Sequence, residues 1–274
     1  VYKRQPYEGD ASFLQGPTER TKAVWNHCLK ALEEERNNNG IRALDYTTVS
    51  TITSHPAGYI DKENELIVGL QTDQVLKRAI KPFGGINVVM KACRENGVEV
   101  DDRVKDIFTH YRKTHNDGVF DVYTEEIRSF RSLGFLTGLP DNYARGRIIG
   151  DYRRLALYGL DRLIEAKKED LHNLTGPMTE ARIRLREEVA EQIKALKEIK
   201  VLGEYYGLDL SRPAYTAQEA VQWVYMAYLA AVKEQDGAAM SLGNVSSFLD
   251  IYLEYELSQG TICLLYTSDA ADDS

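Results

Sequence analysis

Two arginines, Arg145 and Arg147, stand where the sequence leaves a turn and enters a long helical pattern. The turn is the Gly-Leu-Pro-Asp stretch at 138–141, whose residue types favour a reversal of the chain. A helix N-terminus is the positive end of the helix dipole, so two cations there are unfavourable unless an anion binds between them. Each guanidinium offers a planar fork of N–H donors that fits a carboxylate, and the free N–H groups of the first helical turn add further donors. The segment is therefore a candidate carboxylate site. On the residues alone, the favoured interpretation is that both arginines pair with carboxylates of the chain itself, such as Asp141 or Asp151.

The rest of the sequence assembles no catalytic set. The phosphate-loop, dinucleotide, HExxH and GxSxG signatures are absent, which excludes the common nucleotide, zinc-protease and hydrolase motifs. The five histidines show no metal-ligand spacing, so we expect no bound metal and a structural role for each of them: His27, His55, His110, His115 and His172. Three cysteines, Cys28, Cys93 and Cys263, fit neither a disulfide nor a zinc framework and favour a reducing compartment. Cys28 and Cys93 lie on helical faces and are expected to be buried apolar residues rather than nucleophiles.

The composition is that of one globular domain or part of one. Of the 274 residues, 43% are apolar and 28% are charged, with 34 Lys and Arg against 42 Asp and Glu. The net charge of −8 argues against a nucleic-acid partner, which would select a basic surface. No apolar run approaches the roughly 20 residues that span a bilayer, and no export signal is recognisable. We therefore expect a cytoplasmic protein with no membrane contact.

Helical periodicity dominates and supplies the elements that must position the two arginines. Apolar residues recur at helical spacing, which predicts a predominantly α-helical chain with helices at 18–36, 87–95, 101–110, 125–133, 148–171, 185–199, 218–233 and 245–257. The helix at 18–36 is expected to bury one face, with Trp25, Leu29 and Leu32. A β-branched stretch within 41–58 predicts one short strand with turns. The aromatic stripe at 221–228 is expected to form core, with polar tips that reach partners.

A series of sequence blocks resembles the N-terminal part of the pyruvate formate-lyases (formate C-acetyltransferases), which belong to the glycyl radical enzymes. The blocks occur in the family's order between residues 6 and 262, and include PYEGD (6–10), STITSH (50–55), IVGLQT (67–72), LKRAI (76–80), PFGGI (82–86), YRKTHN (111–116), GVFDVYT (118–124), LTGLPD (136–141), RGRIIGDYRR (145–154), QEAVQW (218–223) and GAAMS (237–241). So many ordered blocks make the resemblance specific.

The resemblance implies an α/β fold, a ten-stranded barrel wrapped in helices, of which this chain would hold mostly helices and a few short strands. It implies conversion of pyruvate and coenzyme A to acetyl-CoA and formate. In the family, a glycyl radical passes to a pair of adjacent cysteines, and coenzyme A is a co-substrate rather than a permanently bound cofactor. An S-adenosylmethionine-dependent activating enzyme installs the radical on a homodimeric, cytoplasmic protein. Anaerobic glucose fermentation is the implied setting.

Two residues of this chain match functional positions of the family. Arg147 matches the second arginine of the RGR motif, which holds the pyruvate carboxylate. Phe120, the aromatic of GVFD, matches a position along the approach of coenzyme A. Asn142 and Ala144 depart from the alanine and glycine usual in the family, so the turn before Arg145 is expected to differ.

The catalytic parts of the family are absent from the 274 residues, which contain neither an adjacent cysteine pair nor a glycyl-radical loop. We therefore expect residues 6–262 to be the incomplete N-terminal part of the domain, inactive alone and with no catalytic residue of its own. Residues 1–5 and 263–274 resemble translated sequencing adapter and are expected to be non-native. The alternatives are another 2-keto acid formate-lyase, for example one acting on 2-ketobutyrate, and, less favoured, a non-catalytic helical binding module whose Arg145 and Arg147 grip an acidic partner.

Overall fold

The computed structural model describes residues 16–40, 43–79, 86–111, 123–137, 148–235 and 240–262, and within these ranges the chain is mostly helical, as predicted. The segments at 1–5 and 263–274 lie outside the described residues. The elements in chain order are α1 (Glu19–Asn37), β1 (Ala43–Asp45), β2 (Lys77–Ala79), α2 (Ile86–Glu95), α3 (Asp102–Asp106), the π-helical turn η1 (Ile107–Tyr111), α5 (Glu125–Ser132), β3 (Ile148–Ile149), α7 (Arg153–Asn173), α8 (Glu180–Tyr205), α9 (Ala217–Gln235), β4 (Met240–Ser241) and α10 (Ser246–Ser258).

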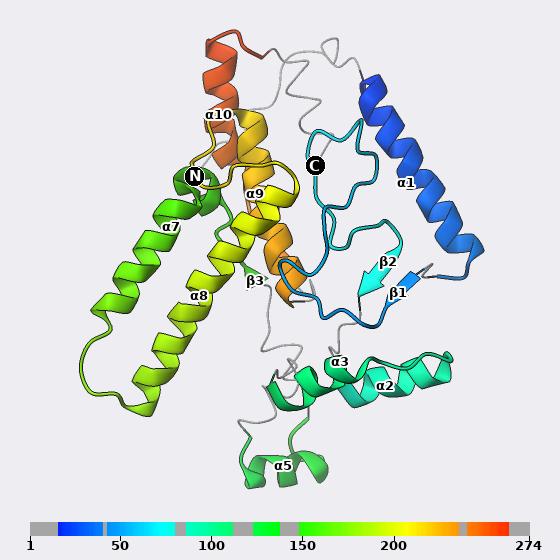
Figure 1. The fold of residues 1–274 in the computed structure, drawn as a ribbon, viewed down its shortest axis with the longest axis vertical. Coiled ribbons are helices and arrows are strands. Elements are labelled where there is room, and N and C mark those ends of the chain that lie inside the picture. The colour runs from blue at the N-terminus through cyan, green and yellow to red at the C-terminus, as the bar shows by residue number, and fades with distance from the viewer. Residues whose placement is uncertain are drawn as a thin grey trace.

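The main core lies between α7, α8, α9 and α10. Helices α7 and α8 form a long antiparallel hairpin, and α9 packs against both of them (Figure 1). The stripe predicted on α9 is confirmed as core, because Trp223, Val224 and Met226 are all buried. The hydroxyl of Tyr225 donates to the carbonyl oxygen of Gly69 at 2.9 Å, so its polar tip also finds a partner.

Helix α7 is broken at Gly159, which has φ 70° and ψ 162°. The segment after α8 crosses the break and supplies hydrogen-bond partners to both halves of α7. Leu160 N donates to Leu210 O at 2.9 Å, and Ala214 N donates to Ala156 O at 2.9 Å. The uninterrupted helix predicted at 148–171 is therefore wrong in its middle, since backbone groups distant in sequence replace the missing helical hydrogen bonds.

The start of that predicted helix is also wrong, because residues 148 and 149 form strand β3. The described residues contain two small parallel sheets, β1 with β2 and β3 with β4. Each sheet joins segments far apart in sequence, which the local spacing of apolar residues does not reveal. No closed barrel is present within these described ranges.

The predicted short strand at 41–58 is confirmed only at its beginning, where β1 ends with Asp45. One side-chain oxygen of Asp45 accepts hydrogen bonds from the backbone N–H groups of Thr47 and Thr48, at 3.1 and 3.0 Å. Such a side-chain turn offers the backbone partners other than a neighbouring strand. The Thr-rich residues that follow therefore run as turns and loop between α1 and α9 (Figure 1).

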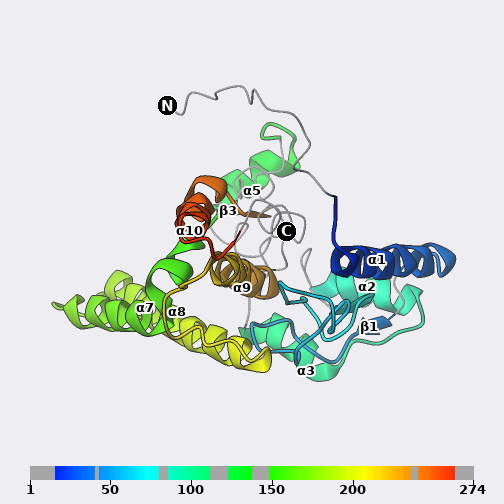
Figure 2. The same ribbon diagram turned by 90° about the horizontal axis from the view of Figure 1, so that it is seen from above.

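Helix α1 lies at the edge of the molecule and buries no residue (Figure 2). Arg20 donates to the carbonyl oxygens of Glu63 and Asn64, and this polar side of the helix holds it to the loop. The apolar stripe is exposed instead, with Trp25 at 63% and Leu32 at 58%. The predicted buried face of this helix is therefore wrong for Trp25, Leu29 and Leu32, which stay exposed, whereas Val24 and Cys28 of the same face are half-buried.

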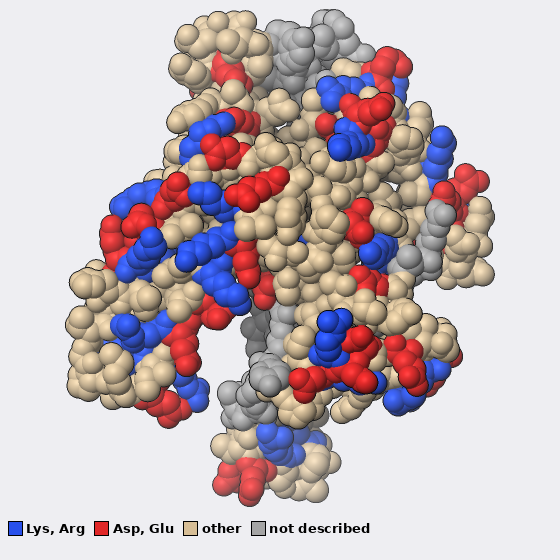
Figure 3. All heavy atoms as spheres, in the orientation of Figure 1, with Lys and Arg blue, Asp and Glu red and all other residues tan. Residues whose placement is uncertain are grey.

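Charges of both signs alternate over α7 and α8 on the face shown in Figure 3, without a large patch of either sign. This pattern suits a solvated helical surface. Among the described residues, no helix is both long enough and apolar enough to cross a bilayer.

Candidate functional site

The strand pair β3–β4 connects the segment of the two arginines to a second sequence block. Arg147 directly precedes β3, and β4 contains the last two residues of the GAAMS block. The parallel pairing of β3 with β4 therefore joins two blocks that are far apart in sequence. Arg145, Arg147 and Phe120 themselves lie outside the described residues, as do Asn142 and Ala144.

The turn from β3 into α7 is fixed by Gly150 and Tyr152. A Cβ atom at position 150 would lie 2.7 Å from the ring of Tyr152, so the close approach requires glycine. Tyr152 is buried and meets the ring of Tyr228 edge to face, with 5.4 Å between the ring centroids. The first turn of α7 is thereby held against α9.

Asp151 and Arg153 form a two-pronged ion pair in the same turn. The Nε and Nη2 atoms of Arg153 donate to the two carboxylate oxygens of Asp151 at 2.7 and 3.2 Å. These hydrogen bonds lower the pKa of the Asp151 carboxyl. One of the two carboxylates considered as partners for Arg145 and Arg147 is thus already engaged on both oxygens.

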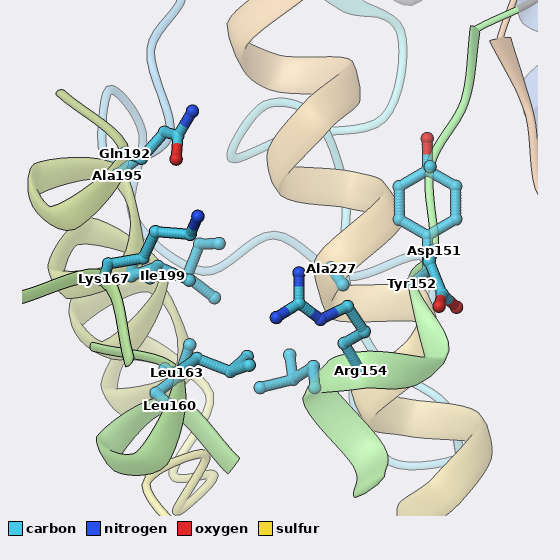
Figure 4. A pocket seen from close by; sticks show the side chains of 13 residues that line it. Asp151, Tyr152, Arg154, Leu160, Leu163, Lys167, Gln192, Ala195, Ile199 and Ala227 are labelled. Carbon is cyan, nitrogen blue, oxygen red and sulfur yellow. The ribbon is translucent and has the colours of Figure 1, made fainter. Parts of the chain in front are cut away.

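A cavity of about 360 Å³ opens beside this turn, between α7, α8 and α9 (Figure 4). Its walls are mainly aliphatic and comprise Leu155, Leu160, Leu163, Ala195, Leu196, Ile199 and Ala227. The polar groups around it are few, chiefly Arg154, Lys167 and Gln192. Such a composition, within the usual size range of ligand pockets, suits an amphipathic small molecule. The ionisable side chains that line the cavity are those of Asp151, Tyr152, Arg154 and Lys167.

The two cations of this cavity differ in how they are paired. Lys167 Nζ lies 2.8 Å from a carboxylate oxygen of Asp170. Arg154 is exposed, and its side chain makes no hydrogen bond or close ion pair within the described ranges, although its charge contributes to lowering the pKa of the Asp151 carboxyl. Neither residue stands out in the sequence. One feature of the sequence could have indicated that Arg154 lacks a partner on its own helix: the positions one turn later are Leu157 and Tyr158, and neither is a carboxylate.

A second cluster of ionisable groups surrounds His55, which is only 3% exposed. Its Nδ1 atom lies 2.9 Å from Ser54 Oγ, and its Nε2 atom lies 3.4 Å from a carboxylate oxygen of Asp45. Lys77 bridges Asp45 and Asp73, with Nζ–O distances of 3.6 and 2.8 Å. Burial lowers the pKa of His55 although Asp45 acts in the opposite direction. His55 is therefore a hydrogen-bonded residue of the interior, as predicted.

Asp45→Asn is expected to reduce the acid sensitivity of folding. Partial burial raises the pKa of Asp45, but hydrogen bonds from Thr47 and Thr48 outweigh it and hold the pKa at about 2, against the usual 3.8. Because the folded pKa is the lower one, the carboxylate stabilises the fold above pH 3.8, and this stabilisation disappears as the pH falls toward 2. Over that window the unfolding free energy of the unsubstituted chain should lose about 2 kcal/mol that the variant does not lose.

Urea unfolding at a series of pH values from neutral to strongly acidic measures this difference. Asp106→Asn, on an exposed helical turn, is the matched control and should follow the unsubstituted chain. If the unfolding free energy of the Asp45→Asn variant falls with pH as that of the unsubstituted chain does, the Asp45 carboxylate is not the source of the acid sensitivity.

The two cysteines in the described residues lie on separate helices. Cys28 on α1 is half-buried, and burial together with the nearby Glu65 carboxylate raises the pKa of its thiol. Cys93 on α2 is buried beside Val100 and Val104, as predicted. Neither is placed as an activated nucleophile. In the described part of the chain, no group of three metal-ligating side chains gathers.

The chain matches the family model described as pyruvate formate lyase-like over residues 2–269. It is 55% identical over 262 residues to the formate acetyltransferase of Haemophilus influenzae. That match covers 94% of this chain and 34% of the relative, so the chain spans about a third of the relative's length.

Two solved structures share the fold at low sequence identity. The glycerol-bound B12-independent glycerol dehydratase from Clostridium butyricum is 17% identical with a TM-score of 0.64, and the match covers 95% of this chain and 40% of the dehydratase. A structure of 1,2-propanediol dehydration in Roseburia inulinivorans is 15% identical with a TM-score of 0.58, covering 94% and 37% of the two chains. At these identities the likeness shows the fold alone. With the match along nearly its whole length, the chain belongs to the pyruvate formate lyase-like family.

Proposed function

We propose that this chain forms the N-terminal part of a formate C-acetyltransferase, which converts pyruvate and coenzyme A to acetyl-CoA and formate by glycyl and thiyl radical chemistry. The observation that carries the proposal is the 55% identity to a formate acetyltransferase along 94% of the chain. The cysteines of this chain, at positions 28, 93 and 263, include no adjacent pair. The thiyl pair and the radical glycine must therefore come from sequence beyond these 274 residues, and the chain alone is expected to be inactive.

Within that enzyme, Arg147 binds the carboxylate of the 2-keto acid, and Phe120 lies along the approach of coenzyme A. The carboxylate role is supported by the planar guanidinium fork, which fits a carboxylate; the N-terminus of α7 adds no donors beside Arg147, because that helix begins only at Arg153. It is also supported by the engagement of Asp151 with Arg153, because both carboxylate oxygens already accept hydrogen bonds from that residue.

The remaining parts of the proposal follow from the family. Residues 6–262 belong to a single incomplete domain. The whole protein is a cytoplasmic homodimer of anaerobic pyruvate fermentation, and a radical S-adenosylmethionine enzyme activates it. Coenzyme A serves as co-substrate, and no cofactor is permanently bound.

The direct test uses the longer open reading frame that contains this chain. The frame should encode an adjacent cysteine pair and a C-terminal glycyl loop, and the anaerobically activated product should form acetyl-CoA and formate from pyruvate. A comparison of pyruvate with 2-ketobutyrate identifies the preferred 2-keto acid. A frame without the cysteine pair, or an activated protein that releases no formate, would overturn the proposal.

Arg147→Lys in that longer protein is expected to raise the KM for pyruvate about tenfold, because an ammonium group cannot reproduce a two-pronged contact with a carboxylate. The KM for coenzyme A should not change. Arg153→Lys is the matched control, since Arg153 already binds Asp151. Steady-state kinetics with each substrate varied in turn make the measurement. An unchanged pyruvate KM in the Arg147→Lys variant would remove this residue from the substrate site.

A further inference from the structure

The cavity between α7, α8 and α9 has features that the proposed reaction does not use. Its deepest walls come from Leu155 and Leu160, which are buried on α7, and from the face of α8 that carries Leu196 and Ile199. An apolar cavity of about 150 Å³ is enough to hold a six-carbon ring, so a cavity of about 360 Å³ holds about 14 non-hydrogen atoms. The space therefore fits an aliphatic chain rather than a single solvent molecule.

Two cations reach over this apolar space. Figure 4 shows the guanidinium of Arg154 and the ammonium of Lys167 directed toward one another from opposite sides of the cavity. Like charges that face each other beside a low-dielectric wall repel, and an anion between them changes the repulsion into attraction. Within the described ranges the guanidinium of Arg154 makes no hydrogen bond and acts on Asp151 only at longer range, so its N–H donors are available to an anion.

The charge balance favours a single negative charge on the ligand. Lys167 already shares its charge with Asp170 at 2.8 Å. Asp151 also borders the cavity, but Arg153 holds both of its oxygens. Arg153 and Arg154 both act on the Asp151 carboxylate, so about one positive charge of the two is left unbalanced. The planar fork of Arg154 suits a carboxylate. The amide nitrogen of Gln192 already donates to a carboxylate oxygen of Glu188 at 3.2 Å and has one further N–H to donate.

We infer that this pocket binds an amphipathic monocarboxylate. The carboxylate lies between Arg154 and Lys167, and an aliphatic tail of about six to ten carbons lies among Leu160, Leu163 and Leu196. The site is independent of the proposed lyase reaction and lies entirely within the described residues.

Calorimetric titration of the longer protein that contains this chain, with four ligands of eight carbons each, tests the inference. Octanoate is expected to bind with one-to-one stoichiometry. Uncharged 1-octanol should bind about tenfold more weakly, and octylammonium should not bind, because only the carboxylate engages the cations. Octyl phosphate distinguishes a monocarboxylate site from a general anion site, and it should bind no more tightly than octanoate. Equal affinities for octanoate and 1-octanol, or tighter binding of octyl phosphate, would overturn the inference.

Three variants locate the site. Arg154→Gln should lower the affinity for octanoate about tenfold, to the level of 1-octanol. Arg162→Gln is the control on the same helix, because Arg162 pairs with Glu169 and does not line the cavity, and it should leave the affinity unchanged. Ala195→Phe places a ring in the cavity and should abolish binding of both ligands. Circular dichroism confirms that each variant is folded, and Lys167→Gln, with the same expected direction, replaces Arg154→Gln if that variant does not fold. If the Ala195→Phe variant still binds octanoate, the ligand binds elsewhere on the protein, and the cavity is not its binding site.

Discussion

Gly159→Ala is expected to lower the free energy of unfolding by roughly 3–5 kcal/mol. With φ 70° and ψ 162°, Gly159 occupies a backbone region that is essentially restricted to glycine. An added Cβ atom would lie 2.4 Å from the backbone carbonyl carbon of Arg212, which cannot rotate away as a side chain could. Relief of this contact would pull apart the hydrogen bonds that hold the segment after α8 across the break in α7. Urea unfolding followed by far-ultraviolet circular dichroism measures the loss.

Gly207→Ala separates the two causes of this effect. Gly207 follows α8 and has a similar φ of 73°, but a Cβ atom there would meet nothing within 4 Å. Its replacement should cost only the backbone strain, about 1–2 kcal/mol. If Gly159→Ala costs no more than Gly207→Ala, the contact with Arg212 does not stabilise the fold as described.

Gln222→Leu is expected to destabilise the chain by roughly 2–4 kcal/mol. Gln222 is buried on α9, where its Oε1 atom accepts from Val68 N at 2.8 Å and its Nε2 atom donates to Val68 O at 2.9 Å. The side chain of Gln222 thus provides partners for both the backbone N–H and the backbone carbonyl of Val68, a loop residue that does not pair with a strand. Leucine fills a similar volume but leaves both groups without their partner, and each such group costs about 1–3 kcal/mol. Chemical denaturation measures the loss, and limited proteolysis should show earlier cleavage in the loop around Val68.

Gln218→Leu is the control one turn earlier on the same helix. Gln218 is exposed, and its amide makes only a single 3.4 Å contact with Leu66 O. Its replacement should change stability by less than about 0.5 kcal/mol. Equal losses of unfolding free energy in the two variants would mean that the hydrogen bonds of Gln222 do not hold the loop around Val68 in place.

The local elements of the fold could be predicted from the sequence because their causes are local. Thr18, Thr124 and Thr179 each cap the N-terminus of a helix by accepting a hydrogen bond from a backbone N–H three residues later. The aromatic stripe of α9 is buried because its spacing matches the helical repeat. Helix caps and apolar spacing depend only on residues close in sequence, so they can be predicted without knowledge of the tertiary structure.

Errors in the expected fold occur where distant segments meet. Residues 148–149 carry a helical pattern but form β3, because β4 offers them backbone partners from another part of the chain. Helix α7 breaks at Gly159 because the segment after α8 supplies the hydrogen bonds that the helix gives up. The exposed stripe of α1 shows the converse, since Trp25 and Leu32 have the spacing of a buried face but nothing in the described chain covers them.

The sequence by itself determined the family, the helical character and Arg147 as the residue to test, because ordered motifs and apolar periodicity are carried by residue identity and local spacing. The tertiary structure alone decided that Arg154 and Lys167, on either side of the break in α7, border one aliphatic cavity with α8 and α9. The physical reason is that a cavity and the convergence of charges on it depend on how helices pack against one another. Residue spacing within a single helix carries no information about that packing.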